Sequence, residues 1–595
     1  MEETEGATTR KLSVVENHRD EILDAFKTHD VVIVVAPTGT GKSTQIPVML
    51  LDIAELVVVT QPRRVAAESL ARRVAMELRT DVGELVGFHT AHKLMSSPNT
   101  RILYCTDGIE ALHQLHRRTN PAETIFVIDE AHEWNLNLEF LIAWFKKLLN
   151  EGELVKLVIL SATIEAERLA EFFGNAIVVN CIGTAFPVTE IEHVGNVAGA
   201  AVRMLKRGLN VLVFVPGKQE IRETIAEIQR NGVAAKCLPF HAELSADDIG
   251  WVFESYDEPK CVVATTIAQT SLTIPDIDVV VDSGLERGNQ YKDGVSGLYT
   301  KPTSLAERQQ RRGRAGRTKP GYYIDCLRIP PSERDPFSTP AILREDLSSL
   351  VLQIMAAGYD PERLAFFHPP DLRRIEEART VLTHLSFLDK EERVTKQGVE
   401  AARLPVLPRA ARMLFESADV NRVVDYNIIT LATLFSHTNV FEFKTEEGKS
   451  LMTALYDEIG VSDAFAKIKT YDAACQAPVH LLTTYGIERS IFERLKENRS
   501  ELVDRLLRLG YAEGNPHARL DARFVVAGLS DLAFVRSKVS GDYTRAGTET
   551  TPRKLPPGSC ITAERAVGIP WNLEKHTEMG PVVRRFLLWA TAVPD

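Results

Sequence analysis

The stretch "VVIVVAPTGTGKST", residues 31–44, decides the fold. Its first six residues are apolar and lack polar alternation, which predicts a strand buried on both faces. The second half is a glycine-rich loop that ends in Gly-Lys-Ser before a helix-like segment. Backbone N–H groups of such a loop point inward and cradle a polyphosphate, aided by the positive end of the following helix. Ala36 replaces the first glycine of this pattern, which is tolerable where the backbone needs no positive φ.

The loop and a second motif predict a site for ATP and Mg²⁺. Lys42 would reach the β- and γ-phosphates, and the Ser43 hydroxyl would bind the metal. The strand that ends in "VIDEAH", 127–132, adds Asp129 as a metal ligand. Glu130 beside it would also face the metal and would polarise the attacking water, so we expect hydrolysis. The expected nucleotide contacts are Thr38, Gly39, Thr40, Gly41, Lys42, Ser43 and Thr44.

Around this stretch, the first 330 residues repeat an apolar run, a turn and a helix-like segment. This rhythm predicts parallel sheets with right-handed crossovers. One set of runs ends near residue 163 and a second begins near residue 211, so we expect two α/β domains, 1–185 and 186–338. The runs are 31–37, 56–62, 101–105, 125–130 and 157–163, then 211–217, 234–240, 261–266 and 279–284. After residue 340 amphipathic helices dominate, and short β runs return at 522–547.

Composition narrows the class of protein. A chain of 595 residues exceeds a single core and should form several domains. The chain has 44% hydrophobic and 25% charged residues, and it has no apolar run long enough to span a bilayer. Its N-terminal residues are acidic and polar, unlike a secretory signal. We therefore expect a soluble protein without a membrane partner. Seven cysteines occur singly, without a CxxC pair, which argues against zinc fingers and disulfides. We expect a reducing, cytoplasmic location, with a nuclear one also open.

The segment "QQRRGRAGR", 309–317, is strongly basic within a chain of net charge −11. Two interpretations are open from the residues alone. The arginines form a solvated patch for nucleic acid, or they reach a phosphate chain that another part of the same protein holds.

The motifs together resemble the DEAH-box helicases, superfamily 2 NTPases that act mainly on RNA. They follow that family's order and rough spacing: 36–47, 60–68, 106–108, 129–132, 161–163, 265–274 and 310–317. The resemblance implies two tandem RecA-like domains. It extends beyond them to a winged helix (339–408), a helical bundle (409–520) and a small OB-fold-like module (521–595).

The resemblance also implies roles for the basic segment. Arg314 and Arg317 would be arginine fingers that close over ATP bound to the first domain, and Gln310 would help to position the water. His132 would bridge the DEAH motif to the last motif, with a satisfied interface histidine as the alternative. For Arg311 and Arg312 we expect structural or solvated roles.

Further residues are assigned to ligands by resemblance alone. Phe253 would lie against the nucleotide base, although a core aromatic is the alternative. Leu112 stands where the family commonly has an arginine that sandwiches the base. Residues 286–304 resemble the family's β-hairpin, either a strand-separating wedge or only a surface hairpin. The nucleic-acid backbone would contact Arg63, Arg64, Thr106, Gly217 and Thr265, with surface ion pairs as the alternative role for the two arginines.

We therefore expect a monomeric, ATP-dependent helicase or translocase that moves 3′ to 5′ on single-stranded RNA. Motif V departs from the family, because Thr266 and Gln269 replace the usual Asn and Glu. Two alternatives stay open. One is an NTPase that remodels ribonucleoprotein, or acts on DNA, without processive unwinding. The other is a weakened motor that serves as a nucleic-acid-binding scaffold.

Overall fold

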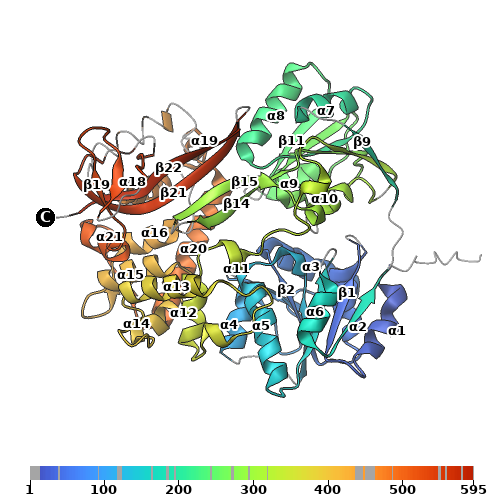
Figure 1. The fold of residues 1–595 in the computed structure, drawn as a ribbon, viewed down its shortest axis with the longest axis horizontal. Helices are drawn as coiled ribbons and strands as arrows, with labels where there is room; N and C mark the ends of the chain where they lie inside the picture. Colours follow the sequence, from blue (N-terminus) through green and yellow to red (C-terminus); the bar gives the residue numbers. More distant parts are fainter. Residues whose placement is uncertain are drawn as a thin grey trace, which may run out of the picture.

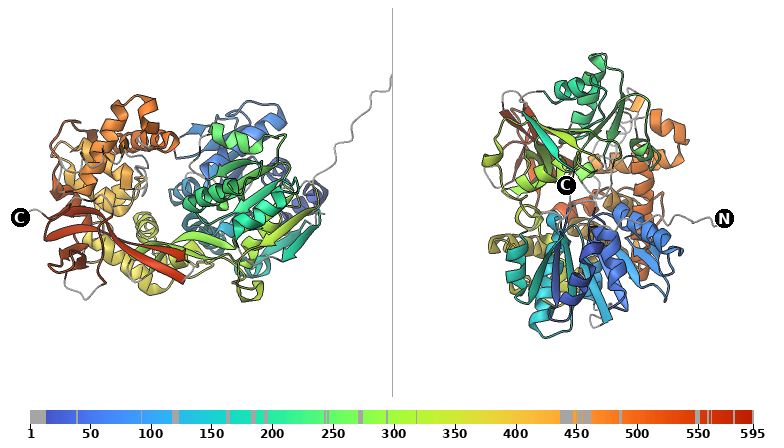
Figure 2. Two further views of the ribbon diagram at one scale, coloured as in Figure 1. Left: turned by 90° about the horizontal axis from the view of Figure 1, so that it is seen from above. Right: turned by 90° about the vertical axis from the view of Figure 1, so that its right-hand side faces the viewer.

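The computed structural model shows two α/β domains with a helical and β-rich C-terminal half beside them (Figures 1 and 2). It describes residues 14–37, 40–91, 93–116, 123–161, 165–181, 186–192, 196–241, 244, 246–269, 274–292, 295–317, 319–435, 447–448, 450, 454, 462–484, 487–546, 551–556, 559, 561–577 and 580–593. Across these ranges, every helix is too short or too polar to cross a bilayer.

The first domain is an eight-stranded sheet in the order β4-β3-β5-β2-β6-β7-β1-β8, parallel except for β4. Along β1, Val31 and Ile33 belong to a core with α5, while Val32 and Val34 belong to a second core with α2 and α3. Both faces are therefore buried, as the unbroken apolar run predicts. The strands are β1 (Val31–Val35), β2 (Leu56–Gln61), β3 (Val86–His89), β4 (Leu94–Met95), β5 (Ile102–Thr106), β6 (Thr124–Ile128), β7 (Lys156–Ser161) and β8 (Ala176–Asn180).

The helices of this domain follow the strands. They are α1 (Arg19–Ala25), α2 (Lys42–Leu50), α3 (Arg64–Leu78), α4 (Asp107–Leu115), α5 (Leu136–Asn150) and α6 (Ala166–Phe173), with the 3₁₀ turns η1 (Glu16–His18) and η3 (Ala131–Glu133).

The second domain is a parallel six-stranded sheet in the order β11-β12-β10-β13-β16-β9. Its strands are β9 (Val188–Glu192), β10 (Val211–Phe214), β11 (Lys236–Phe240), β12 (Lys260–Ala264), β13 (Val279–Asp282) and β16 (Gly321–Asp325). Its helices are α7 (Val197–Leu205), α8 (Lys218–Arg230), α9 (Ala246–Phe253) and α10 (Leu305–Arg312), with η4 (Thr266–Gln269). Two α/β domains in tandem are confirmed.

The C-terminal half is mainly helical up to residue 529. Its helices are α11 (Ala341–Arg344), α12 (Ser348–Ala356), α13 (Leu372–His384), α14 (Lys396–Ala401), α15 (Pro408–Ser417), α16 (Tyr426–Phe435), α18 (Asp463–Gln476), α19 (Val479–Thr484), α20 (Arg489–Arg508) and α21 (Ala522–Leu529), with η5 (Pro331–Glu333) and η6 (Pro361–Arg363). Two short strands, β17 (Val423–Val424) and β18 (Ala512–Glu513), pair in parallel.

The prediction of a β run at the start of 522–547 is wrong, because residues 522–529 form α21. The Asp521 side chain caps this helix by accepting from the Arg523 N–H at 2.9 Å. Val525 and Leu529, four residues apart, are buried on one face, and a Cβ at Gly528 would come within 2.6 Å of the Arg409 carbonyl oxygen on α15. Packing against α15 therefore decides the conformation of a run with many strand-forming residues.

A third sheet joins the second domain to the C-terminal half. The predicted hairpin is present as β14 (Leu285–Lys292) and β15 (Val295–Pro302). Residues 296–298 of β15 pair in parallel with residues 571–573 of β21 (Arg565–Thr577), so the hairpin is more than a surface feature. Figure 1 shows the hairpin reaching across to β21 and β22. The remaining strands are β19 (Ala533–Arg536), β20 (Tyr543–Arg545) and β22 (Gly580–Ala592).

Candidate nucleotide and nucleic-acid site

The phosphate loop leads from β1 to α2 at the carboxyl edge of the first sheet. Gly41 has φ 89°, a conformation that favours glycine, and Lys42 begins the helix. The Lys42 ammonium is buried and donates to the carbonyl oxygens of Ala36 and Pro37. Burial lowers the pKa of Lys42, whereas Glu130 and Asp129 raise it. Thr38 and Gly39 lie outside the described residues.

Hydroxyl groups hold the rest of the loop in shape. The Thr40 hydroxyl donates to the Pro37 carbonyl at 2.8 Å, and the Thr44 hydroxyl donates to the Gly41 carbonyl at 3.3 Å. Ala36 stands where the motif usually has glycine, and it is not among the described residues with positive φ. An alanine is therefore tolerated at this position, as predicted.

The predicted metal ligands lie together. Asp129 is fully buried directly after β6, and the nearby Ser43 side chain acts to lower its pKa. It also accepts from the Gln61 amide at 2.6 Å and from the Glu130 backbone N–H at 2.8 Å. Burial, then the neighbouring Glu130 charge, raises the pKa of Asp129 to about 6. A hydroxyl and two carboxylates are hard oxygen donors of the kind that Mg²⁺ prefers, so these residues fit the ion.

His132, the last residue of the DEAH motif, lies on the side of the first domain next to the second. Its Nδ1 lies 3.5 Å from the Ser161 hydroxyl, and its Nε2 lies 3.6 Å from a Glu130 carboxylate oxygen. Burial, then the Lys42 charge, lowers the pKa of His132 to about 4, so the ring is neutral. His132 and Gln310 line one cavity of about 220 Å³ between the two domains.

The end of the basic segment faces the first domain. Arg314 is buried and donates to the Gln269 carbonyl oxygen. Burial lowers the pKa of Arg314 and brings that of Arg317 to about 10, while the Glu130 charge opposes the shift in both. Arg317 also lowers the pKa of Lys42, so its charge acts at the phosphate loop. Charges of the first domain thus affect the pKa values of two arginines of the second.

Other arginines of the segment are structural, as expected. Arg311 is fully buried and donates to Asp282 at 2.7 Å and to the Leu285 carbonyl at 3.2 Å. The partly exposed Arg312 forms an ion pair with Glu190 at 2.8 Å.

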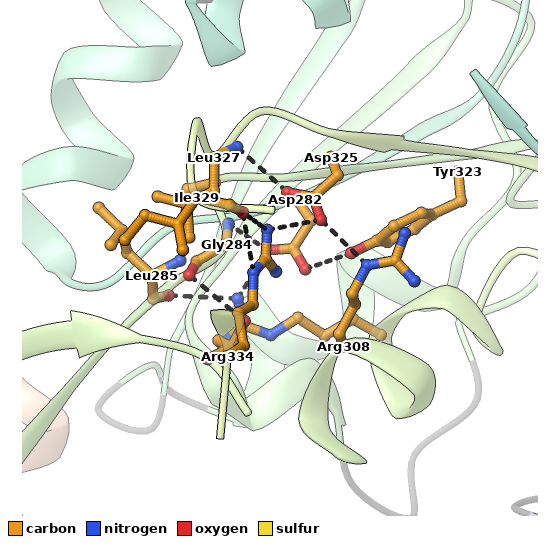
Figure 3. Close-up of polar contacts among 12 residues, drawn as sticks. Asp282, Gly284, Leu285, Arg308, Tyr323, Asp325, Leu327, Ile329 and Arg334 are labelled. Atoms are coloured by element: carbon orange, nitrogen blue, oxygen red, sulfur yellow. Dashed lines mark hydrogen bonds and ion pairs between the residues drawn. The ribbon is translucent and has the colours of Figure 1, made fainter. Parts of the chain in front are cut away.

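Figure 3 shows the network of which Asp282 is a part. The Tyr323 hydroxyl donates to Asp282 at 2.8 Å, and Arg308 and Arg334 both bind Asp325, at 3.0 and 2.8 Å. Arg308, together with Arg311 on Asp282, fixes α10 on the ends of β13 and β16, and Arg334 adds the segment after η5.

Arg63 and Arg64, although adjacent, have different surroundings. Arg63 caps α3 and forms an ion pair with Glu133 at 3.1 Å, just after the DEAH motif. Arg64 instead lines a cavity of about 780 Å³ between α3, α4 and α20. Leu112 lines the same cavity.

The other predicted backbone contacts lie at the ends of elements. Thr106 is the N-cap of α4 and Gly217 is the N-cap of α8. The first backbone N–H groups of each helix, which have no hydrogen-bond partner within the helix, therefore lie next to these residues. The Thr265 N–H donates to the Phe240 carbonyl at 3.1 Å. Lys218, beside Gly217, contacts Glu488 at 3.8 Å, which places the second domain next to the start of α20.

Family models match both α/β domains. The DEAD/DEAH box helicase model matches residues 17–172, and the helicase conserved C-terminal domain model matches residues 196–319. Together these ranges enclose the phosphate loop, the DEAH motif and both arginines. The chain belongs to the DEAH-box helicases. Its two α/β domains are the tandem RecA-like domains of that family.

Curated relatives carry helicase names. The chain is 34% identical over 449 residues to the ATP-dependent RNA helicase HrpA of Escherichia coli K12, covering 70% of this chain and 34% of the relative. It is 32% identical over 428 residues to HrpA of Borreliella burgdorferi, covering 67% and 52%. The chain thus spans about a third to a half of these relatives. A crystal structure of the E. coli DExH-box NTPase HrpB matches with TM-score 0.78 at 25% identity, covering 99% of this chain and 69% of that one.

Within this helicase fold, Phe253 packs in a core position. Its ring meets Phe240 edge-on at 6.4 Å and contacts the core of the second domain. Because the Phe253 side chain is only partly buried, its contact with a nucleotide base stays a prediction.

Two polar residues of the site were missed by the sequence reasoning. Gln61 holds Asp129, and Glu133 contacts Arg63. The signal for Gln61 was available, because a polar residue at the end of an otherwise apolar strand marks the sheet edge where the ligands gather. Glu133 gave no comparable signal, since an acid after "DEAH" reads equally well as a solvated side chain.

Proposed function

We propose that the chain is an ATP-dependent helicase motor that moves 3′ to 5′ on single-stranded RNA. The observation that carries this proposal is the position of Arg314 and Arg317. Their charges come from the second RecA-like domain and act on Glu130, and that of Arg317 also on Lys42, of the first. An arginine supplied across a cleft couples hydrolysis to closure of the two domains.

In this proposal each residue has a separate task. Lys42 and the loop N–H groups bind the phosphates, while Ser43, Asp129 and Glu130 would hold Mg²⁺. When bound, Mg²⁺ neutralises charge on the phosphate oxygens. Glu130 accepts a proton from the attacking water, which Gln310 and the neutral His132 orient. Arg314 and Arg317 stabilise the negative charge that develops on the γ-phosphate.

RNA as the substrate is supported by the relatives' names and by the surfaces that border α20. Arg64 lines the cavity against this helix, and Gly217 lies next to the helix start. Arginines and backbone N–H groups contact phosphates rather than bases, which gives binding that does not depend on sequence. Such contacts bind DNA as well, so the choice of strand needs a direct test.

The test uses duplexes with a single-stranded overhang at either the 3′ or the 5′ end, in RNA and in DNA. We expect ATP-dependent strand separation with the 3′ RNA overhang and little with the 5′ overhang. Separation from the 5′ overhang would overturn the direction, and equal activity on DNA would overturn the RNA preference. ATP hydrolysis without any strand separation would favour the remodelling NTPase instead.

A further inference from the structure

An acidic residue directly after the DEAH motif touches the helix that carries a proposed nucleic-acid contact. Glu133 Oε1 lies 3.1 Å from a terminal nitrogen of Arg63, an ionic contact whose alignment falls short of a hydrogen bond. The Glu133 side chain is 22% exposed and that of Arg63 is 38% exposed. The Glu133 side chain is therefore the more enclosed of the two.

The backbone around Glu133 is held in one shape. Glu130 and Trp134 both have positive φ, 52° and 39°, a conformation that is rare for a bulky residue such as Trp. The Trp134 carbonyl accepts from the Ala341 N–H at 2.9 Å, and the Trp134 ring stacks on Phe367 at 5.0 Å. Because such a backbone persists only where its surroundings enforce it, the contacts of Ala341 and Phe367 with Trp134 fix this loop and the position of Glu133.

Glu133 also lies among the carboxylates of the ATP site. Burial raises the pKa of Glu133 to about 7, the Arg63 charge opposes this shift, and the charges of Glu130, Asp107 and Asp129 add to it. Asp107, at the start of α4, is held by the Asn135 amide at 2.6 Å. The positive charge of Arg63 thus opposes a group of carboxylates that includes Asp129 and Glu130 of the DEAH motif.

We propose that Glu133 is a positioning residue that orients Arg63 toward the nucleic-acid backbone and so links strand binding to the DEAH loop. A guanidinium presents five N–H donors in a rigid fork. Glu133 contacts one terminal nitrogen at 3.1 Å, which restricts the orientation of the guanidinium plane. Without this contact, the Arg63 side chain would become ordered only when the nucleic-acid strand binds, and the lost conformational freedom would lower the affinity. This inference rests on the proposed function.

A double-mutant cycle tests the link. Binding of a fluorescent single-stranded RNA oligonucleotide is measured for wild type, Glu133→Gln, Glu133→Asp, Arg63→Gln and Arg63→Gln/Glu133→Gln at several salt concentrations. We expect Glu133→Gln and Glu133→Asp each to weaken binding about 3- to 10-fold, and the double variant to bind no more weakly than Arg63→Gln. Glu77→Gln, which removes the 3.0 Å pair with Arg73 on the same helix, is the matched control and should bind like wild type.

Three results would overturn the inference. The first is additive losses in the double variant, which would show that Glu133 does not act through Arg63. The second is tighter binding by Glu133→Gln at low salt, which would mean that the carboxylate only repels phosphate. The third is wild-type binding by Glu133→Asp, since this variant keeps the charge and changes only its position. If wild type binds no oligonucleotide, the proposed function fails and the inference falls with it. If wild type binds and the cycle is additive, only the inference fails.

Discussion

Arginines within one short segment differ in how their charge is balanced. Arg311 is buried against Asp282, and its pKa is raised despite burial. Arg314 and Arg317 are also enclosed, yet the pKa of each is lowered, because burial outweighs the opposing charge of Glu130. A buried cation that is incompletely balanced interacts strongly with an incoming anion. The first arginine therefore supports the fold, whereas the other two are the ones that we propose to act on the γ-phosphate.

This difference predicts a stability effect at Arg311. Arg311→Ala leaves Asp282 buried without its cation, which should lower the free energy of unfolding of the second domain by about 3–5 kcal/mol. Arg312→Ala, the control, removes a half-exposed pair with Glu190 and should cost less than about 1 kcal/mol. Chemical denaturation followed by fluorescence measures both. Equal losses for the two variants would contradict the structural role of Arg311.

At the scale of elements, the hairpin β14–β15 has an unexpected partner. Its predicted role as a free wedge does not account for the pairing of β15 with β21. At Gly297 the two strands approach so closely that a Cβ would come within 2.6 Å of the Asn572 carbonyl oxygen. Asn572 also donates to the Tyr299 hydroxyl at 2.9 Å. The hairpin thus ties the second domain to the C-terminal sheet.

Gly297→Ala should loosen this connection. The added methyl group meets backbone and cannot be relieved by a side-chain rotation, so residues 296–298 and 571–573 should lose protection in hydrogen–deuterium exchange. Gly288→Ala on the neighbouring strand is the control, because a Cβ there meets only the Arg344 side chain, at 3.9 Å. Unchanged protection in Gly297→Ala would show that the two strands are not tightly paired.

Local features of the structure could be predicted from the sequence, whereas contacts between distant residues could not. The buried strands and the phosphate loop were predictable, because apolar runs and glycine spacing are written in consecutive residues. The helix α21 was not, because its contact with α15 overrides a strand-like composition. The pairing of β15 with β21 and the stacking of Trp134 on Phe367 join residues more than two hundred positions apart, and periodicity carries no information about such contacts.

At the scale of the whole molecule, the three parts are connected unequally. One hydrophobic core runs from the face of the first sheet that carries α5 into the helices and strands of the C-terminal half. The second RecA-like domain has its own two cores, on either side of its sheet. Its contacts with the rest include the β15–β21 pairing and the Lys218–Glu488 contact at 3.8 Å. We therefore expect the second domain to move against a body formed by the other two parts.

The most direct test of this account is steady-state ATP hydrolysis by wild type and Arg317→Ala, measured while single-stranded RNA is added. Wild type should be stimulated by RNA, because strand binding favours closure. Arg317→Ala should lose about 10³-fold or more in rate while still binding ATP and RNA, because only the charge supplied across the cleft is missing. Hydrolysis by Arg317→Ala at the wild-type rate would contradict the closing-motor account, as would a wild-type rate that RNA leaves unchanged.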